Sequence, residues 1–331
     1  MRPTAALLIF TCAATAQFKS TVPLVVAPTT VKDARGRFID GLTATDLVLY
    51  DNNVPQAIQM DWTVYPISLV VAVQTSLSAA AVLDKFNASG ILFTDLLAAD
   101  AGETAVLSFG EQVEIRQAFT ADPDAVAHAL LRLKAKGPRA PALDAVRTAV
   151  QMLNERPSER RRIVLVIGEK RDRSSQAKLP EVLQEVERRN VSVYWLTWSP
   201  SWTAFTHRPP KRADRETRAE RRKDLRRDDP VPAIDPPPPN LLEGIAELAR
   251  LAQPNLAETF TQATGARSLN FLRKNALEEA IRAVGEEVHR QYVLSFQPRA
   301  GGDGQFHAIR VAVKGRPDLQ VTTRAGYWSA P

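Results

Sequence analysis

The sequence predicts an α/β fold, a doubly wound and mostly parallel sheet inserted into a small antiparallel β module that both chain ends form. Residues 67–73 and 162–167 are almost continuously apolar, which is typical of strands covered on both faces. Strands alternate with helical segments from residue 66 to residue 198, as parallel sheets require. Short strands of alternating polarity occupy the two ends of the chain.

Composition excludes several classes of protein. The chain has 331 residues, 44% hydrophobic and 24% charged, which is too apolar for a disordered chain and long enough for one large or two smaller domains. A single cysteine and four histidines exclude a disulfide scaffold and a cysteine-based zinc site. The longest apolar run is too short to span a bilayer, so we expect no membrane span.

The N-terminus has the layout of an export signal. Arg2 precedes an apolar stretch over residues 5–14, and Ala14-Thr15-Ala16 has the small-x-small form of a cleavage site. We therefore predict a signal peptide over residues 1–16 and an exported protein, periplasmic or extracellular. The only cysteine, Cys12, would be removed with it. The alternative is a buried N-terminal helix in a cytosolic protein.

Both ends of the chain are expected to be β structure. Residues 17–62 form an N-terminal β segment, with strands near 22–26, 29–32 and 46–51 and turns at 33–37 and 52–55. Residues 298–331 are expected to contain a hairpin of 306–314 with 319–324. Each end is too short to bury a core alone. We therefore expect residues 22–51 to pair with residues 306–324.

The segment between the ends, residues 63–297, is expected to be the α/β domain. Its predicted strands and helices alternate, apart from the adjacent pair 104–109 and 113–119. The predicted strands are 67–73, 104–109, 113–119, 162–167, 191–198 and 291–296, and residues 264–271 are expected to hold a C-cap glycine and a short strand. The predicted helices are 78–100, 122–134, 143–153, 176–189, 241–263 and 276–290. Residues 206–240, rich in Pro, Arg and Asp, indicate a mobile insertion without stable contacts to the core.

Two loops are the first candidates for a binding site, since ligands of doubly wound sheets lie at the carboxyl ends of the strands. These loops are residues 74–78 and 168–172. We find no G-x-S-x-G motif, no phosphate-binding loop and no histidine spacing suited to a metal. His128 and His289 are expected on helix surfaces, and Glu286 and Glu287 as a solvated pair. Without a nucleophile and base, the sequence predicts a protein that is not an enzyme.

The layout resembles a von Willebrand factor A domain, and more narrowly the secreted bacterial VWFA-related family. The N-terminal part of this resemblance lies in Asp33-Ala34-Arg35-Gly36-Arg37, Gly41-Leu42-Thr43-Ala44-Thr45-Asp46 and Leu49-Tyr50-Asp51. The C-terminal part lies in Gln291-Tyr292-Val293-Leu294 and Arg324-Ala325-Gly326-Tyr327-Trp328. The resemblance covers nearly the whole mature chain and implies a protein-binding or adhesion-type function.

The resemblance also implies the place of a metal site, which in the family uses Asp-x-Ser-x-Ser, a threonine and an aspartate. Ser76 and Ser78 match the two serines, whereas Gln74 stands at the first aspartate, Ala140 at the threonine and Glu169 at the last aspartate. Mg²⁺ gives up water reluctantly and needs oxygen ligands with countercharge. We therefore expect a degenerate site with no metal bound tighter than millimolar, and no cofactor. The favoured interpretation of Ser76 and Ser78 is that they cap the next helix.

A basic segment within the insertion is the alternative site. Residues 208–227 hold ten Lys and Arg against four Asp and Glu, a net +6 that equals the charge of the whole chain. Such a segment could bind glycans, lipid head groups or nucleic acid. The absence of aromatic residues within it makes nucleic acid the least favoured. The candidate residues are Lys211, Arg212, Arg215, Arg218, Arg221 and Arg222.

The expected function is therefore recognition of an unidentified protein partner through the α/β domain, without metal. There are two alternatives for the basic segment. It binds an anionic polymer, or it is a solvated segment without a ligand. Binding to an anionic polymer would weaken steeply with salt.

Overall fold

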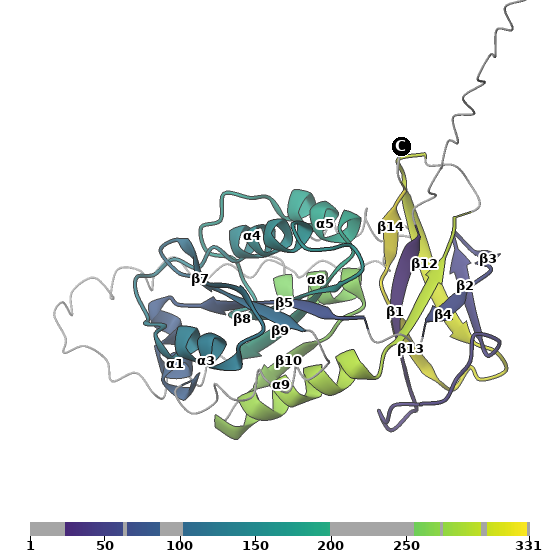
Figure 1. The fold of residues 1–331 in the computed structure, drawn as a ribbon, viewed down its shortest axis with the longest axis horizontal. Coiled ribbons are helices and arrows are strands. Elements are labelled where there is room, and N and C mark those ends of the chain that lie inside the picture. Colours follow the sequence, from purple (N-terminus) through teal and green to yellow (C-terminus); the bar gives the residue numbers. More distant parts are fainter. Residues whose placement is uncertain are drawn as a thin grey trace, which may run out of the picture.

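The computed structural model describes residues 24–61, 65–86, 102–198, 255–271, 274–298 and 303–329. These residues form a helix-covered α/β domain and a β sandwich that lie side by side (Figure 1). The signal peptide, the whole insertion over 206–240, the end of the helix expected over 78–100 and the start of that expected over 241–263 lie outside the described residues.

The α/β domain is built on a six-stranded sheet in the order β10-β9-β8-β5-β6-β7. Five neighbouring strands are parallel, and β7 runs antiparallel to β6. The strands are β5 (Ile67–Gln74), β6 (Glu103–Phe109), β7 (Val113–Thr120), β8 (Arg161–Ile167), β9 (Val191–Trp198) and β10 (Ser268–Phe271). The predicted doubly wound, mostly parallel sheet is confirmed.

Helices cover both faces of this sheet (Figure 1). On one face lie α4 (Ala142–Asn154), α5 (Leu179–Arg188) and α8 (Leu256–Thr264). On the other lie α1 (Ala80–Phe86), after the short 3₁₀ helix η1 (Leu77–Ala79), α3 (Pro123–Leu131) and α9 (Lys274–His289). Every residue of β5 is buried, because its alternate side chains enter the two different cores. This double burial explains the continuous apolar run.

The two chain ends form the β sandwich. One sheet has the order β13-β1-β11-β4, and the facing sheet has the order β14-β12-β2-β3. The first contains β1 (Val25–Lys32), β4 (Gln59–Asp61), β11 (Tyr292–Phe296) and β13 (Gln320–Thr323). The second contains β2 (Leu47–Asp51), β3 (Val54–Gln56), β12 (Phe306–Val313) and β14 (Gly326–Trp328). Apolar side chains of both sheets meet in one core.

The expected pairing of the chain ends is confirmed, because β2 pairs with β12 and β1 pairs with β13, both antiparallel. The expected hairpin is wrong: β12 and β13 lie in different sheets, and the turn at residues 314–319 crosses from one to the other. Alternating polarity specifies which face of a strand is buried but not which strand lies beside it. The same limit applies to β11, which was expected in the α/β domain and instead pairs with β1 and β4.

Candidate functional site

The two predicted loops meet at the carboxyl edge of the parallel sheet. They follow β5 and β8, which are neighbours although β6 and β7 separate them in the chain. The chain therefore reverses its direction of winding between these two strands, and ligands of such sheets bind at this switch point. The structure places Gln74, Ser76 and Ser78 on the first loop and Glu169 on the second.

The side-chain amide of Gln74 joins the two loops. Its Oε1 accepts a hydrogen bond of 2.7 Å from the Glu169 backbone N–H, so its nitrogen faces the other way. That nitrogen donates to Ser76 Oγ at 2.6 Å, and it lies 3.2 Å from Ser78 Oγ and 3.4 Å from Glu169 Oε2. Gln74 is fully buried. The amide nitrogen is thus surrounded by the oxygen atoms that the family resemblance assigns to a cation.

The expected capping role of the serines is wrong for Ser76. This residue stands at the N-cap of η1, but its side chain makes no capping hydrogen bond. Its hydroxyl instead accepts from Gln74 and lies 2.9 Å from Ser78 Oγ. A serine that caps a helix accepts a hydrogen bond from a backbone N–H of the first turn. The Ser76 hydroxyl accepts from the side chain of Gln74, two residues earlier, instead.

Ala140, at the position of the family threonine, lies in a buried bridge between loops. Its backbone N–H and carbonyl both bond to Arg173, at 2.9 and 3.0 Å. The Arg173 guanidinium in turn forms an ion pair of 3.3 Å with Glu169. On the same loop, Gly168 allows Phe109 and the Gln74 amide to approach closely, since a Cβ there would lie 2.8 Å from Phe109 Cζ and 3.1 Å from Gln74 Oε1. Arg173 partly neutralises the one carboxylate of the site.

These residues do not fit a Mg²⁺ site. The group at the centre of the oxygen atoms is an N–H donor, which cannot ligate a cation, and Ala140 offers no side-chain oxygen. Among the five positions of the family's metal site, only Glu169 carries a carboxylate, and that carboxylate forms an ion pair with Arg173. Within the described parts of the chain, no group of three or more His, Cys, Asp or Glu is arranged to hold a metal ion.

The other residues considered in the sequence have varied surroundings. The six basic candidates of residues 208–227 lie outside the described residues. His128 and His289 are exposed on helices, as expected. Glu287 was expected to be solvated but is buried, with ion pairs of 2.7 Å to Lys32 and 3.4 Å to Arg267. Glu287 thus links α9 to Lys32 on β1 of the sandwich. Helix periodicity alone cannot indicate this contact between two domains.

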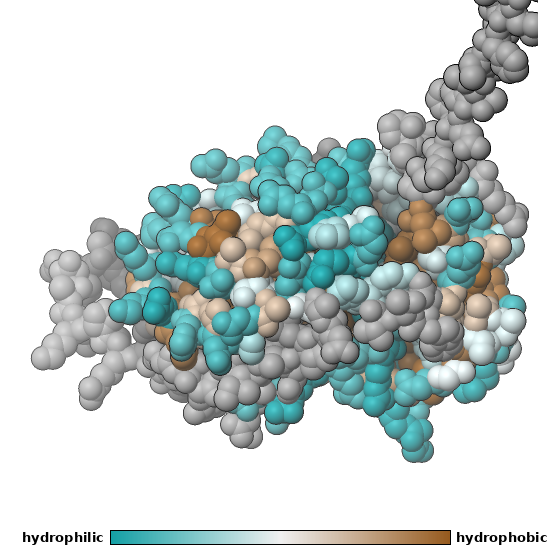
Figure 2. Space-filling view, viewed as in Figure 1, coloured by the Kyte–Doolittle hydropathy of each residue, from teal (hydrophilic) through white to brown (hydrophobic). Residues whose placement is uncertain are grey.

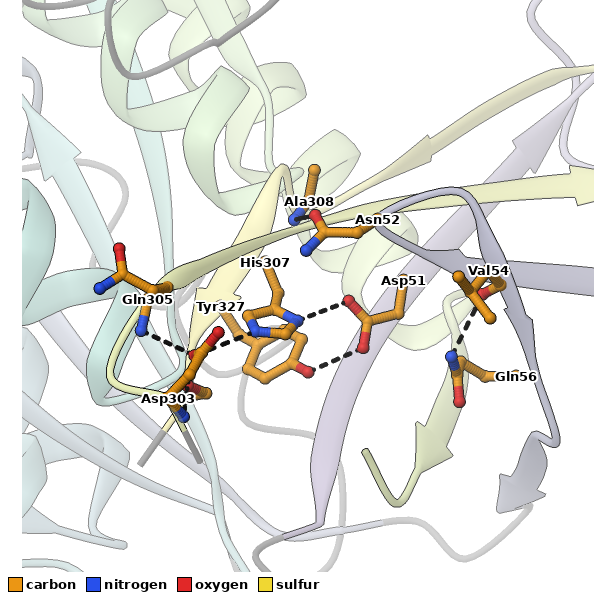
Figure 3. A network of polar contacts seen from close by, with 10 residues as sticks. Asp51, Asn52, Val54, Gln56, Asp303, Gln305, His307, Ala308 and Tyr327 are labelled. Carbon is orange, nitrogen blue, oxygen red and sulfur yellow. Dashed lines mark hydrogen bonds and ion pairs between the residues drawn. The ribbon is translucent and has the colours of Figure 1, made fainter. Parts of the chain in front are cut away.

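A second polar cluster, in the sandwich, was missed by sequence reasoning (Figure 3). His307 Nδ1 lies 2.9 Å from Asp51 Oδ1, and its Nε2 lies 3.2 Å from Asp303 Oδ1. The Tyr327 hydroxyl donates to the other oxygen of Asp51 at 2.9 Å. The cluster joins residues more than 250 positions apart in the chain. Every hydrogen-bonding atom of the imidazole and of the Asp51 carboxyl has a partner within the fold, which indicates a structural role.

Comparison with known proteins gives a family match for part of the chain. Residues 69–170 match the family model described as von Willebrand factor type A domain. The match runs from β5 past β8 and includes the first loop and residues 168–170 of the second, among them Glu169. The comparison with curated proteins gives no match.

Solved structures resemble the chain at low sequence identity. A structure titled von Willebrand factor type A from Catenulispora acidiphila is 10% identical, with a TM-score of 0.45, over 95% of this chain and 65% of that one. The conserved hypothetical protein BatB from Bacteroides thetaiotaomicron is 15% identical, with a TM-score of 0.42, over 67% of this chain and 97% of that one. None of the helices in the described ranges is sufficiently long and apolar to cross a membrane.

Proposed function

We propose that this chain, whose residues 69–170 match the family model described as von Willebrand factor type A domain, is a non-enzymatic recognition protein that binds a protein partner without a divalent metal. Domains of this family generally mediate protein–protein interaction or adhesion. The proposed binding surface is the loop face at the carboxyl edge of the sheet. The export signal expected over residues 1–16 would place this face in the periplasm or outside the cell.

The observation that carries the proposal is the Gln74 amide. In an intact family site, a cation would attract a carboxylate of the partner and would hold the two loops together. Here the amide holds the loops through hydrogen bonds to Ser76 and Glu169. The loop face is therefore organised by the protein alone, and no cation is needed to order it.

The exposed groups around the site suit contact with a protein surface. Leu77, between the two serines, is 54% exposed although it is a large apolar side chain. Lys136, Arg139 and Arg171 are also exposed on the neighbouring loops. An apolar contact surrounded by positive charge favours a partner with an acidic surface, because charge complementarity guides association.

The metal arm of the proposal is tested by calorimetry with Mn²⁺ and Mg²⁺. We expect the natural chain to bind neither ion tighter than millimolar. The double variant Gln74→Asp, Ala140→Thr restores a carboxylate and a hydroxyl, so it should bind Mn²⁺ at least tenfold more tightly. Micromolar binding by the natural chain that disappears in Ser76→Ala would overturn the proposal.

The partner arm is tested by affinity capture from envelope extracts, with and without EDTA. We expect the same captured protein in both conditions and its loss with Leu77→Glu, which removes the apolar contact and repels an acidic partner. Ile115→Glu is the matched control, since Ile115 is 57% exposed but lies on β7, away from the two loops. Capture that EDTA abolishes, or that both variants reduce equally, would contradict the proposal.

A further inference from the structure

A pocket of about 500 Å³ lies between the α/β domain and the β sandwich, at the opposite edge of the parallel sheet from the loop face. The sandwich contributes Val26 and Pro28 of β1 and Val293 of β11. The α/β domain contributes the start of β8 and the junction between α5 and β9. This volume lies within the range of pockets that hold small organic molecules.

One side of the pocket is strongly positive. Arg160, Arg161, Arg162 and Arg189 line it, and Glu159 is the one acidic residue among the described residues of the lining. Arg160 has a carboxylate partner, since its Nε lies 3.1 Å from Glu103. The other three arginines contribute the positive charge that matters for a ligand.

The described contacts of Arg161 and Arg162 are with neutral acceptors. Arg161 donates to the Val288 carbonyl at 2.8 Å and to Gln291 Oε1 at 2.6 Å. Arg162 donates to the backbone carbonyls of Arg189 and Arg156, at 3.2 and 3.1 Å. These bonds orient the guanidinium planes, although Arg162 Nε is buried without a hydrogen-bond partner in the described parts of the chain. No carboxylate of the described ranges offsets the charge of Arg161, and Glu159 offsets part of that of Arg162. Burial lowers the pKa of both arginines, and the neighbouring Arg189 lowers that of Arg162 further.

The opposite side of the pocket is apolar. Val26 and Pro28 alternate along β1 with Val25 and Ala27, which belong to the sandwich core, so they face outwards into the pocket. Leu24, which also lines the pocket, is 49% exposed. An apolar wall facing a net positive charge is complementary to an amphipathic anion.

We propose that this interdomain pocket binds an organic anion with an aliphatic body, of the size of a medium-chain carboxylate. Its carboxylate would lie against Arg162 and Arg189, and its chain against Val26, Pro28 and Val293. The pocket lies at the opposite edge of the sheet from the loop face, so this site is separate from the proposed partner surface. The family match assigns no ligand to it. Its occupation would bridge the sandwich and the α/β domain.

The test is calorimetric titration of the full chain with decanoate, with decanol as the neutral analogue. We expect one decanoate per chain and at least tenfold weaker binding of decanol. Arg189→Glu places a negative charge at the pocket and should weaken decanoate at least tenfold. Arg132→Glu makes the same change of charge on an exposed arginine at the C-cap of α3, which does not line the pocket, and should leave binding unchanged.

A second variant separates loss of the pocket from loss of the fold. Ser192, at the start of β9, lines the pocket, so Ser192→Trp should fill it without changing the charge. We expect no decanoate binding by this variant while the melting temperature stays within a few degrees of the natural chain. The proposal is overturned if decanol binds as well as decanoate, if Arg189→Glu and Arg132→Glu weaken binding equally, or if no decanoate binds to the natural chain.

Discussion

At the scale of single residues, His307 is held between two carboxylates of the sandwich (Figure 3). Burial alone would lower its pKa, but the hydrogen bonds to Asp51 and Asp303 outweigh this effect and raise it. The pKa of Asp303 falls to about 2, through hydrogen bonds from Ser329, from the Gln305 backbone and from His307. The contact between these two residues is therefore most favourable when the imidazole is protonated and the Asp303 carboxyl is ionised.

This arrangement predicts that the stability contributed by His307 depends on pH. A raised pKa means a contribution that is complete below the unfolded value of about 6.5 and is lost as pH rises through the folded pKa. The lowered pKa of Asp303 means that its contribution is present above about pH 4 and is lost as pH falls towards 2. We expect His307→Gln to lower the melting temperature by several degrees at pH 5.5 and by less at pH 9.

Thermal scans of both proteins at the two pH values provide the measurement. The loss at pH 5.5 corresponds to about 1–2 kcal/mol, typical of a hydrogen bond to a charged group. His289→Gln is the control, because His289 is exposed at the end of α9 and should change neither value. An equal loss at both pH values would show that the charge of His307 plays no part.

At the scale of elements, one arginine fastens the end of the sandwich to α5. Arg324, between β13 and β14, is buried, and its guanidinium donates to the Gly326 and Glu187 carbonyls at 2.7 Å and also to Asn190 Oδ1. The carboxylate of Glu187 accepts from Trp328 Nε1 at 2.9 Å. Burial raises the pKa of Glu187 and lowers that of Arg324 to about 10, so each charge depends on the other.

We predict that Arg324→Met strongly destabilises the protein. Removing the cation leaves a buried carboxylate and several carbonyls without their donor, at a cost of about 3–5 kcal/mol. Arg316→Met is the matched control, since Arg316 forms an ion pair with Asp318 that is exposed to solvent and therefore contributes little to stability. Denaturant unfolding of both variants measures the difference, and similar losses for the two would contradict the role given to Arg324.

At the scale of the whole molecule, the first and last strands depend on one another. β2 lies between β3 and β12, and β1 lies between β13 and β11. The α/β domain is inserted between β4 and β11, which are themselves paired. Hydrophilic residues cover most of the visible surface over α5 (Figure 2), and the buried apolar side chains of the described residues gather in three cores.

Truncation after residue 305 should therefore loosen the N-terminal strands. It removes β12, β13 and β14, so β2 loses its main partner and β1 loses one of its two. We expect the amides of residues 47–51 to exchange with solvent much faster in the truncated chain. Residues 67–74, buried in the parallel sheet, should keep most of their protection. Hydrogen exchange followed by mass spectrometry measures both, and unchanged protection of residues 47–51 would contradict the interdependence.

The sequence by itself determined the features that follow from local pattern. The apolar run of β5 predicts a central buried strand, the alternation of strands and helices predicts a parallel sheet, and the two ends predict paired β segments. It also placed Gln74 and Glu169 on neighbouring loops, because parallel strands end at the same edge. These inferences needed only the period of the side chains and the order of the elements.

Only the tertiary structure decided which strands and side chains became neighbours. The alternating pattern of β12 and β13 suits either sheet, so it could not show that they separate into two. Three polar contacts join distant parts of the chain. They are the Gln74 amide with Glu169, the His307 imidazole with Asp51, and the Arg324 guanidinium with the Glu187 carbonyl. Such contacts depend on how two elements pack in space, and the local sequence around each residue does not determine that packing.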